Sequence, residues 1–351
     1  MRQSRHDLEQ ELRRRISEGV YKPGSRLPLR RELLDEFGAS PLTLQRAMDR
    51  LAEQGFILPQ GTRGTFVAEH LPNRACLALL FPNDAEHLTN RFFRTLHQVG
   101  SAWPASDGIV FKSYFLSDQL LDVPEHRRLC ADLADGGLAG IISATSPHYL
   151  VGSPLFKSKV PHVVIGTATA ELMARYRSSY VDMVDGGTQA AVFRWIRAAG
   201  RQRVAFLNHA SEQAFPWQEL LREHGLMTRP EWWLGIPSSA AVGAQAIARL
   251  LCSPPLPHRP DALVITDDNL VPYAIAGVLD AGLQAPRDLV LAAHTNFPAP
   301  THAALPCLRY GTDVVSILRA AAEEVERLTR GAKFRIREVA QVINEPSTLA
   351  G

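Results

Sequence analysis

Short apolar runs separated by helical stretches constrain the fold of this 351-residue chain more than any other feature. Seven such runs follow one another along the chain: CLALLF, GIVFKSYF, AGIISA, VPHVVIG, RVAFLN, DALVIT and LVLAAH. Each has the length of a strand buried on both faces, and most stretches between them are long enough for a crossover helix. One doubly wound sheet seldom needs so many strands. The pattern therefore predicts two α/β lobes, each built on a doubly wound parallel sheet, with a cleft between them.

The N-terminal part has a different pattern, which predicts three helices. Apolar residues recur every four positions over residues 7–18, as in an amphipathic helix. The loop YKPGSRLP follows, and a second helix is predicted over residues 30–37 with Gly38 as its stop. Ser40 suits the N-cap of a third helix and Pro41 its first position, where a missing N–H is harmless.

The third helix and the segment after it complete a recognisable outline. Leu44, Ala47, Met48 and Leu51 fall at i, i+3, i+4 and i+7, so one face of this helix is predicted to be buried. The segment FILPQGTRGTFVAEH then gives two short β-type runs around a Gly-rich turn. Three helices followed by such a hairpin predict an α+β winged helix-turn-helix.

This N-terminal region resembles the DNA-binding domain of the GntR family of bacterial transcription regulators. The matching positions are Pro23-Gly24, Leu27-Pro28, Arg31, Gly38, Ser40, Thr43 and the GTFV of residues 64–67. The resemblance implies that the third helix enters the major groove, with Arg31, Ser40, Thr43 and the wing, through Arg63 and Gly64, contacting DNA. The other interpretation is a small helical bundle with a hairpin that serves only as an interaction module.

Two arginines of the family pattern are replaced here by Pro41 and Gln45. A Gln side chain pairs with adenine N6 and N7, whereas Arg prefers guanine, so we expect Thr43 and Gln45 to read bases and Gln45 to favour adenine. Gln45 could instead be a solvated surface residue. Arg46 and Arg50 are expected to contact phosphates.

The rest of the chain resembles the effector-binding domain of the LacI/GalR family, which has the bilobal fold of periplasmic sugar-binding proteins. The best segments are YVDMVDGGTQAAVFRWIRAAGRQRVAFLNH, PDALVITDDNLVPYAIAGVLDAGLQAPRDLVLAAH and LPCLRYGTD. A GntR-type head on a LacI-type body resembles arabinose-repressor-like regulators. The expected domains are a winged helix-turn-helix over residues 1–68, a linker over 69–75 and a bilobal effector-binding and dimerisation domain over 76–346.

Polar and aromatic residues follow the predicted strands, where an open α/β sheet binds its ligands. The segments are PNDAEHLTNRFF, TSPHY, NHASEQAFPW, TDDN and HTNFP. Asp182 is added to them because we expect it at the start of the second lobe. From them we select a set of candidate ligand-binding residues: Asn83, Asp84, Asn90, Ser146, Asp182, Trp217, Asp268 and Asn296. Asp182 and Asp268 could instead be turn residues or helix caps, and Trp217 could be a core residue. Trp217 and Thr295 stand where the LacI/GalR pattern has an Arg and an Asp, which leaves the ligand class open.

Other classes of protein find little support in the sequence. Motifs of nucleophile elbows, zinc proteases, dinucleotide sites and P-loops are missing, so we expect no catalytic residues and no cofactor. The four cysteines lack the spacing of a metal site, and no apolar run approaches a membrane span or a signal sequence. We therefore expect a cytoplasmic protein with no membrane partner.

These observations predict a ligand-responsive regulator, expected to repress a carbohydrate operon. It is expected to bind a two-fold, double-stranded DNA operator as a homodimer, with a small sugar-like effector between the lobes. The alternative is a cytoplasmic sugar-binding or sugar-processing protein with an incidental helical N-terminal module.

Overall fold

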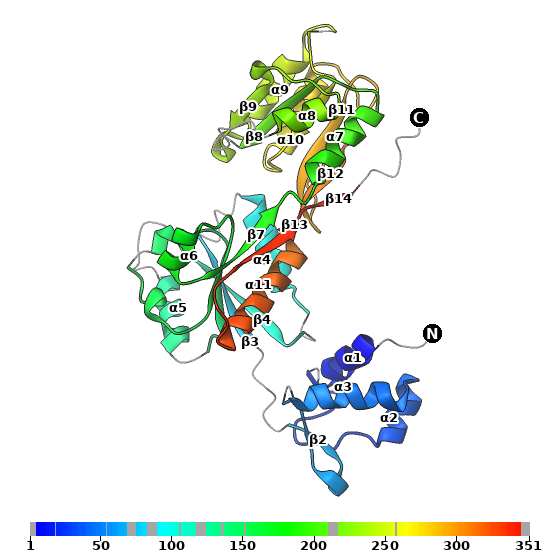
Figure 1. The fold of residues 1–351 in the computed structure, drawn as a ribbon, viewed down its shortest axis with the longest axis vertical. Helices are drawn as coiled ribbons and strands as arrows, with labels where there is room; N and C mark the ends of the chain where they lie inside the picture. The colour runs from blue at the N-terminus through cyan, green and yellow to red at the C-terminus, as the bar shows by residue number, and fades with distance from the viewer. Residues whose placement is uncertain are drawn as a thin grey trace.

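The computed structural model of the protein contains a winged head and two α/β lobes (Figure 1). It describes residues 5–17, 19–53, 55–68, 75–82, 90–104, 107–116, 124–134, 137–150, 152–209, 217–256 and 258–344.

The head, residues 5–68, consists of three helices and a two-stranded wing. Its elements are α1 (Arg5–Ser17), α2 (Arg30–Phe37), α3 (Pro41–Glu53), β1 (Ile57–Pro59), the 3-10 turn η1 (Gly61–Arg63) and β2 (Thr65–Val67). Strands β1 and β2 are antiparallel, with Ile57 opposite Val67. The apolar stripes expected on α1 and α3 are buried together in the head's core, which explains why these helices pack against each other. The three predicted helices and the wing are confirmed.

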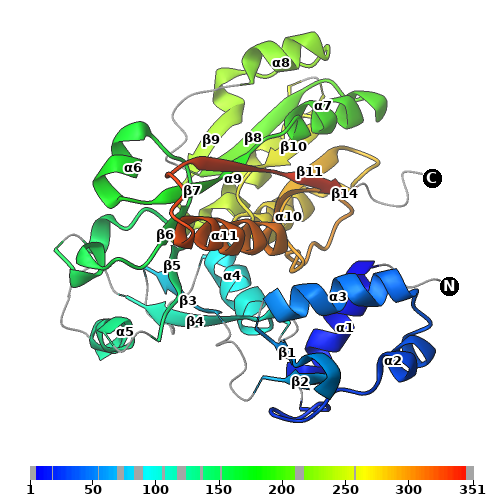
Figure 2. The same ribbon diagram turned by 60° about the horizontal axis from the view of Figure 1, so that its bottom comes forward.

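The N-terminal lobe is built on a six-stranded parallel sheet with the order β13-β7-β6-β5-β3-β4. Helices α4 and α11 pack on one face of this sheet and α5 on the other (Figure 1 and Figure 2). The turns η4 and η5 pack on the same face as α5. The elements are β3 (Ala75–Phe81), α4 (Arg91–Ser101), β4 (Ile109–Phe115), α5 (Pro124–Ala134), β5 (Gly140–Ser143), η4 (His148–Leu150), η5 (Pro154–Lys157), β6 (His162–Ile165), α6 (Ala170–Tyr176), β7 (Ser179–Val184), α11 (Val314–Thr329) and β13 (Ile336–Ala340).

The C-terminal lobe has a second six-stranded sheet, ordered β14-β12-β11-β10-β8-β9. All of its neighbouring strands are parallel except β14, which runs antiparallel to β12. Helices α9 and α10 cover one face and α7 and α8 the other. The elements are α7 (Thr188–Ala198), β8 (Val204–His209), α8 (Gln218–Glu223), η6 (Pro230–Trp232), β9 (Trp233–Ile236), η7 (Ser238–Ala240), α9 (Gly243–Cys252), β10 (Ala262–Ile265), α10 (Val271–Asp280), β11 (Val290–Phe297), β12 (Leu308–Asp313) and β14 (Val342–Asn344).

The chain passes between the lobes three times: from β7 to α7, from β12 to α11 and from β13 to β14. The first and third crossings touch. The amide N–H of Gln341 donates to the carbonyl of Val184 at 2.9 Å, and Thr188 Oγ1 donates to the carbonyl of Gln341 at 3.3 Å. Gly186 has φ of +59°, and a Cβ there would lie 2.7 Å from the Cβ of Ala340. The first and third crossings therefore form one short, hydrogen-bonded connection between two separately packed lobes.

The seven strands predicted from apolar runs are all present, in two doubly wound sheets as expected. One placement was wrong. Asp182 was expected to open the second lobe, but it lies in β7, which pairs with β6 and β13 in the N-terminal lobe. The chain crosses to the second lobe only after Val184, because β7 still completes the first sheet.

Within the described segments, every helix is too short or too polar to traverse a bilayer.

Candidate DNA-binding surface and ligand pocket

The N-terminus of α3 is organised by Ser40 and Thr43. Ser40 Oγ accepts from the backbone N–H of Thr43 at 3.1 Å, which is the predicted capping bond, and the two hydroxyls are 2.7 Å apart. Ser40 is exposed and Thr43 is half-buried. Both hydroxyls therefore sit at the end of α3 that carries the positive end of the helix dipole, where an anion is favoured.

Gln45 is held by two neighbouring side chains. Its Oε1 accepts from the guanidinium of Arg30 on α2, and its Nε2 donates to Asp49 Oδ1, one helical turn later, at 2.5 Å. A Gln amide has two acceptor positions on its oxygen and two N–H donors, so one of each stays available for a base edge. Arg30 and Asp49 thus fix the amide in one orientation without using all of its hydrogen-bonding groups.

The arginines of the head differ in how they are engaged. Arg31, Arg46 and Arg63 are exposed. Arg50 is exposed too, but its Nη1 lies 3.3 Å from Glu9 Oε2 on α1, and the Glu9 side chain is only 7% exposed. A phosphate contact by Arg50 must compete with this ion pair, which the sequence spacing did not indicate.

Gly64 in the wing lies against Arg26. It has φ of +102°, a conformation that favours glycine, and a Cβ there would lie 2.6 Å from Arg26 Nε. The backbone of Arg26 forms an isolated antiparallel β-bridge with Phe66 of β2, so the exposed guanidinium of Arg26 lies beside the wing. Arg26 and Arg30 were missed as surface cations of this face. Arg26 directly precedes the matched pair Leu27-Pro28, and Arg30 directly precedes Arg31, so these positions could have identified them from the sequence.

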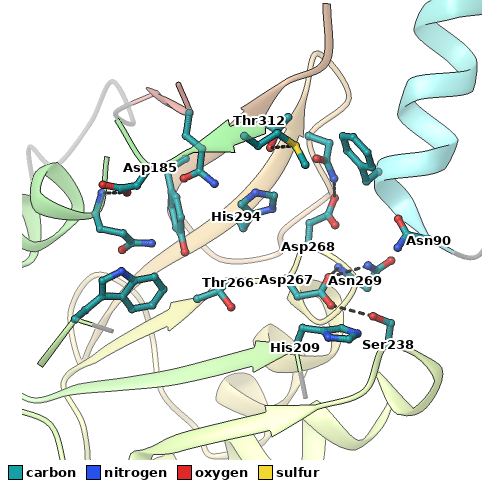
Figure 3. Close-up of a pocket in the computed structure, with 17 residues that line it drawn as sticks. Asn90, Asp185, His209, Ser238, Thr266, Asp267, Asp268, Asn269, His294 and Thr312 are labelled. Carbon is teal, nitrogen blue, oxygen red and sulfur yellow. Dashed lines mark hydrogen bonds between the residues drawn. The ribbon is translucent and has the colours of Figure 1, made fainter. Parts of the chain in front are cut away.

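A pocket of about 380 Å³ lies between the two lobes (Figure 3). This volume is within the range of small-ligand sites. Residues from both lobes and from the crossings line it: Asn90, Phe92, Met183, Asp185, Gln189, His209, Trp217, Ser238, Thr266, Asp267, Asp268, Asn269, His294, Asn296, Tyr310, Thr312 and Gln341.

One edge of the pocket is formed by the loop between β10 and α10. Asp267 Oδ1 accepts from both the backbone N–H and the side-chain amide of Asn269, at 2.9 and 2.7 Å, and its Oδ2 accepts from Ser238 at 3.0 Å (Figure 3). Asn269 Oδ1 in turn accepts from the backbone N–H of Arg91 at 3.1 Å. Because Arg91 begins α4 of the other lobe, this bond joins the two lobes at the pocket edge.

Asp268 and Asn296 form a buried pair in the pocket wall. Asp268 is 3% exposed and Asn296 2% exposed, and Asn296 Nδ2 donates to Asp268 Oδ2 at 2.7 Å. Burial raises the pKa of Asp268 to about 7; the bond from Asn296 opposes this shift and the neighbouring Asp267 adds to it. Asn296 Oδ1 has no hydrogen-bond partner among the residues that the structure describes. It is therefore a buried acceptor available to a ligand.

His294 lies in the middle of the pocket (Figure 3). Burial lowers its pKa to about 4, so the ring is neutral at physiological pH. Its Nδ1 is buried and finds no partner in the described part of the chain. The ring stands edge-on to Tyr310, at 5.9 Å between centroids.

Asp185 lies on the crossing between β7 and α7 and lines the pocket, with His294 between it and the loop of Asp267 in the view of Figure 3. Its carboxylate accepts from the backbone N–H groups of Gln189, at 2.8 Å, and Gly187, at 3.0 Å, which caps the start of α7. Trp217 also lines the pocket, and its ring packs against Phe206 and Trp233. Trp217 is thus held by the core of the C-terminal lobe and still borders the cavity.

Four of the candidate ligand residues predicted from sequence line this pocket: Asn90, Trp217, Asp268 and Asn296. Ser146 and Asp182 are not among its lining residues; Ser146 presents its carbonyl to His148, and Asp182 lies within β7. Asn83 and Asp84 lie outside the described residues.

Several lining residues were not selected from the sequence. Asp267, Asn269, His294 and His209 belong to the quoted segments TDDN, HTNFP and NHASEQAFPW, so their position after a strand was the available signal. Asp185, Gln189, Gln341 and Thr312 lie at or beside the interlobe crossings, which no periodic pattern marks. Groups of three or more His, Cys, Asp or Glu side chains placed to hold a metal ion are absent from the described part of the chain.

These features define a winged helix-turn-helix domain joined to a bilobal α/β body with a pocket between its lobes. Comparison with known families identifies the family of each domain. Residues 5–67 match the model of the gntR family of bacterial regulatory proteins, and residues 189–346 match a periplasmic binding protein-like domain. The chain therefore carries a GntR-family head on a periplasmic-binding-protein-like body, as the sequence resemblance predicted.

The curated relatives match only part of this chain. The histidine utilization repressor of Klebsiella aerogenes is 37% identical over 62 residues, which are 18% of this chain and 26% of that protein. The chain spans between about a quarter and a half of the length of the first curated relatives it matches.

Two solved structures show the likeness of the body. A regulatory protein of the LacI family from Chloroflexus aggregans matches with a TM-score of 0.59 at 15% identity, covering 78% of this chain and 98% of that one. A LacI family transcriptional regulator from Enterococcus faecium, with bound ribose, matches with a TM-score of 0.55 at 15% identity, covering 77% and 97%. At such identities the likeness concerns the fold alone.

Proposed function

We propose that this chain is a cytoplasmic, ligand-responsive transcription regulator that represses a carbohydrate operon. It binds a two-fold operator as a homodimer through its heads, and a small sugar-like effector binds between the lobes of each body. The observation that carries the proposal is the presence, on one chain, of a GntR-family head with an exposed, capped α3 and a body whose pocket is lined from both lobes.

The head supports DNA binding through two kinds of contact. Exposed Arg31, Arg46 and Arg63 supply sequence-independent phosphate contacts. Thr43 and the oriented amide of Gln45 supply base contacts in the major groove, with Gln45 favouring adenine. Substitution of these arginines should therefore weaken binding to all DNA sequences, whereas substitution of Thr43 or Gln45 should weaken discrimination between sequences.

The pocket supports a small polar effector. Its wall combines carboxylates, amides and aromatic rings, the groups that bind polyhydroxylated molecules. A ligand touching both sides stabilises one arrangement of the lobes, and the short crossings carry that preference to the rest of the body. The bound ribose of the Enterococcus faecium regulator, which has the same fold, is in keeping with a sugar-like effector.

The test is a band shift of the full-length chain on the DNA upstream of its own gene, with monosaccharides that raise its melting temperature added in turn. The proposal expects a discrete complex that outcompetes scrambled DNA and whose affinity changes with one of those sugars. Trp217→Ala should abolish the response to the sugar and keep DNA binding, whereas Arg46→Ala should weaken DNA binding and keep the sugar-induced rise in melting temperature. Non-specific DNA binding that no sugar changes would contradict the proposal.

A further inference from the structure

The charge of the pocket is the feature that the proposed function leaves unused. Three aspartates line it, Asp185, Asp267 and Asp268, and no lysine or arginine is among its described lining residues. The sequence segments next to lining residues, 83–89 and 210–216, contain no lysine or arginine either. Arg91 lies close enough to Asp268 to oppose the rise in its pKa, but its side chain does not line the pocket. The acidic character of the wall therefore comes from Asp185 and Asp267, because Asp268, with a pKa raised to about 7, keeps most of its protons at about pH 6.5.

The carboxylates are not used up by the protein's own hydrogen bonds. Asp185 accepts two backbone N–H bonds, and Asp267 accepts three bonds from neutral donors. A carboxylate offers about four acceptor positions, and neutral donors leave its charge in place. Both groups can therefore accept a further bond from a ligand.

Aromatic rings and unpartnered acceptors surround these carboxylates. Phe92, Trp217 and Tyr310 border the same cavity, and an aromatic face attracts a cation in a desolvated site. Asn296, 2% exposed, presents an Oδ1 without a partner among the described residues, which requires a donor from the ligand. The carboxylates and the aromatic rings favour a ligand with positive charge, and the unpartnered Asn296 Oδ1 favours one that also offers a hydrogen-bond donor.

We infer that the pocket selects a small polyhydroxylated ligand carrying a protonated amine, such as an amino sugar, over its neutral counterpart. This inference rests on the proposed function, because it names the class of the effector. In such a complex the ammonium group binds Asp185, and the hydroxyls contact Asp267, the amides and His294. A neutral sugar leaves both carboxylates without a counter-charge when the lobes exclude water.

The test is isothermal titration calorimetry on the full-length chain with three matched pairs: D-glucosamine and D-glucose, D-galactosamine and D-galactose, and D-mannosamine and D-mannose. N-acetylated forms serve as uncharged controls. The titrations run at about pH 6.5, below the usual pKa range of an α-amino group. We expect at least one amino sugar to bind about tenfold or more tightly than its neutral partner and its N-acetylated form. Equal or tighter binding of the neutral sugars, or no binding of any amino sugar at millimolar concentration, overturns the inference.

Two variants test whether the carboxylate of Asp185 causes the preference for the amino sugar. Asp185→Asn keeps a side chain that can cap α7 and should weaken the amino sugar about tenfold, the size expected for losing one charged hydrogen bond, while changing neutral-sugar binding little. Asp280→Asn makes the same charge change at an exposed position of α10 outside the pocket and should leave both affinities unchanged. Equal losses in the two variants contradict the assignment.

A DNA-binding assay separates this inference from the proposed function. Specific DNA binding that responds only to neutral sugars overturns the inference and keeps the regulator. Tight amino-sugar binding by a chain without specific DNA binding overturns the regulator and keeps the pocket assignment.

Discussion

Asp268 links the pocket to a measurable pH dependence of stability. Its pKa rises from an ordinary 3.8 to about 7 because the carboxyl is buried. Below about pH 4 the folded and unfolded chains both carry the proton. Between about pH 4 and 7 the unfolded chain releases it while the folded chain retains it, so stability falls as pH rises. At about 1.4 kcal/mol per tenfold change in proton affinity, the full effect is about 4 kcal/mol.

Asp268→Asn removes this penalty and keeps an acceptor for the Asn296 amide. The variant should exceed the wild type in unfolding free energy by about 1.5 kcal/mol at pH 5 and about 4 kcal/mol at pH 8. Asp267 and Arg91 act on Asp268 in opposite directions and are unchanged in the variant. The result to compare with the prediction is therefore the increase, from pH 5 to pH 8, of the difference in unfolding free energy between Asp268→Asn and the wild type.

Urea unfolding followed by tryptophan fluorescence suits this test. Four of the five tryptophans, Trp195, Trp217, Trp232 and Trp233, belong to the C-terminal lobe, so their signal reports on the lobe that contains Asp268. Asp280→Asn is the matched control and should show no such trend. A difference between Asp268→Asn and wild type that stays constant from pH 5 to pH 8 would refute the reasoning.

Three further predictions concern the head and the crossings. Gln45→Ala should cost about 1–3 kcal/mol of discrimination at one operator base pair and leave scrambled DNA unaffected, as competition band shifts with single-base variants measure; a uniform loss contradicts it. Arg46→Ala should weaken all sequences alike and reduce by about one the slope of log affinity against log salt; an unchanged slope removes its phosphate role. Gly186→Ala should lower stability by about 1–3 kcal/mol in thermal unfolding, more than Gly282→Ala, because both glycines have positive φ but only Gly186 meets Ala340 at 2.7 Å. Equal losses would place the effect in the backbone conformation alone.

Sequence patterns predicted the architecture well because burial produces periodicity. The stripe of α3 and the seven apolar runs each reflect a face turned to a core, and all of them occupy the predicted elements. Strands with fewer apolar residues were missed. Strand β13, IREVA, lies at a sheet edge and alternates exposed and half-buried residues, so it lacks the run that marks a central strand.

The pocket could be predicted only in part. Polar residues directly after strands, as in TDDN and HTNFP, do line it, since the carboxyl ends of parallel strands meet at one edge of a sheet. Asp185 and Gln341 could not be found in this way, because their position depends on the chain crossing between lobes at points far apart in sequence. The misplacement of Asp182 has the same origin: the sequence does not mark which sheet β7 joins.

The side-chain pairings of the head were also beyond the sequence. Helical spacing places Gln45 and Asp49 on one face, but the bond from Arg30 depends on how α2 packs on α3. Likewise, the ion pair between Arg50 and Glu9 depends on the contact between α1 and α3. Such pairings decide which cations stay available to DNA.

The measurement that tests the central claim most directly is the affinity of the full-length chain for DNA that it has itself enriched from a randomised pool, with and without an effector. Fluorescence anisotropy at fixed salt gives this affinity, and the effector is the sugar or amino sugar that binds most tightly in calorimetry. We predict binding at least about 10³-fold tighter than to scrambled DNA, and an affinity that the effector changes about fivefold or more. Enriched DNA bound no better than scrambled DNA, or an affinity that no pocket ligand changes, would contradict it.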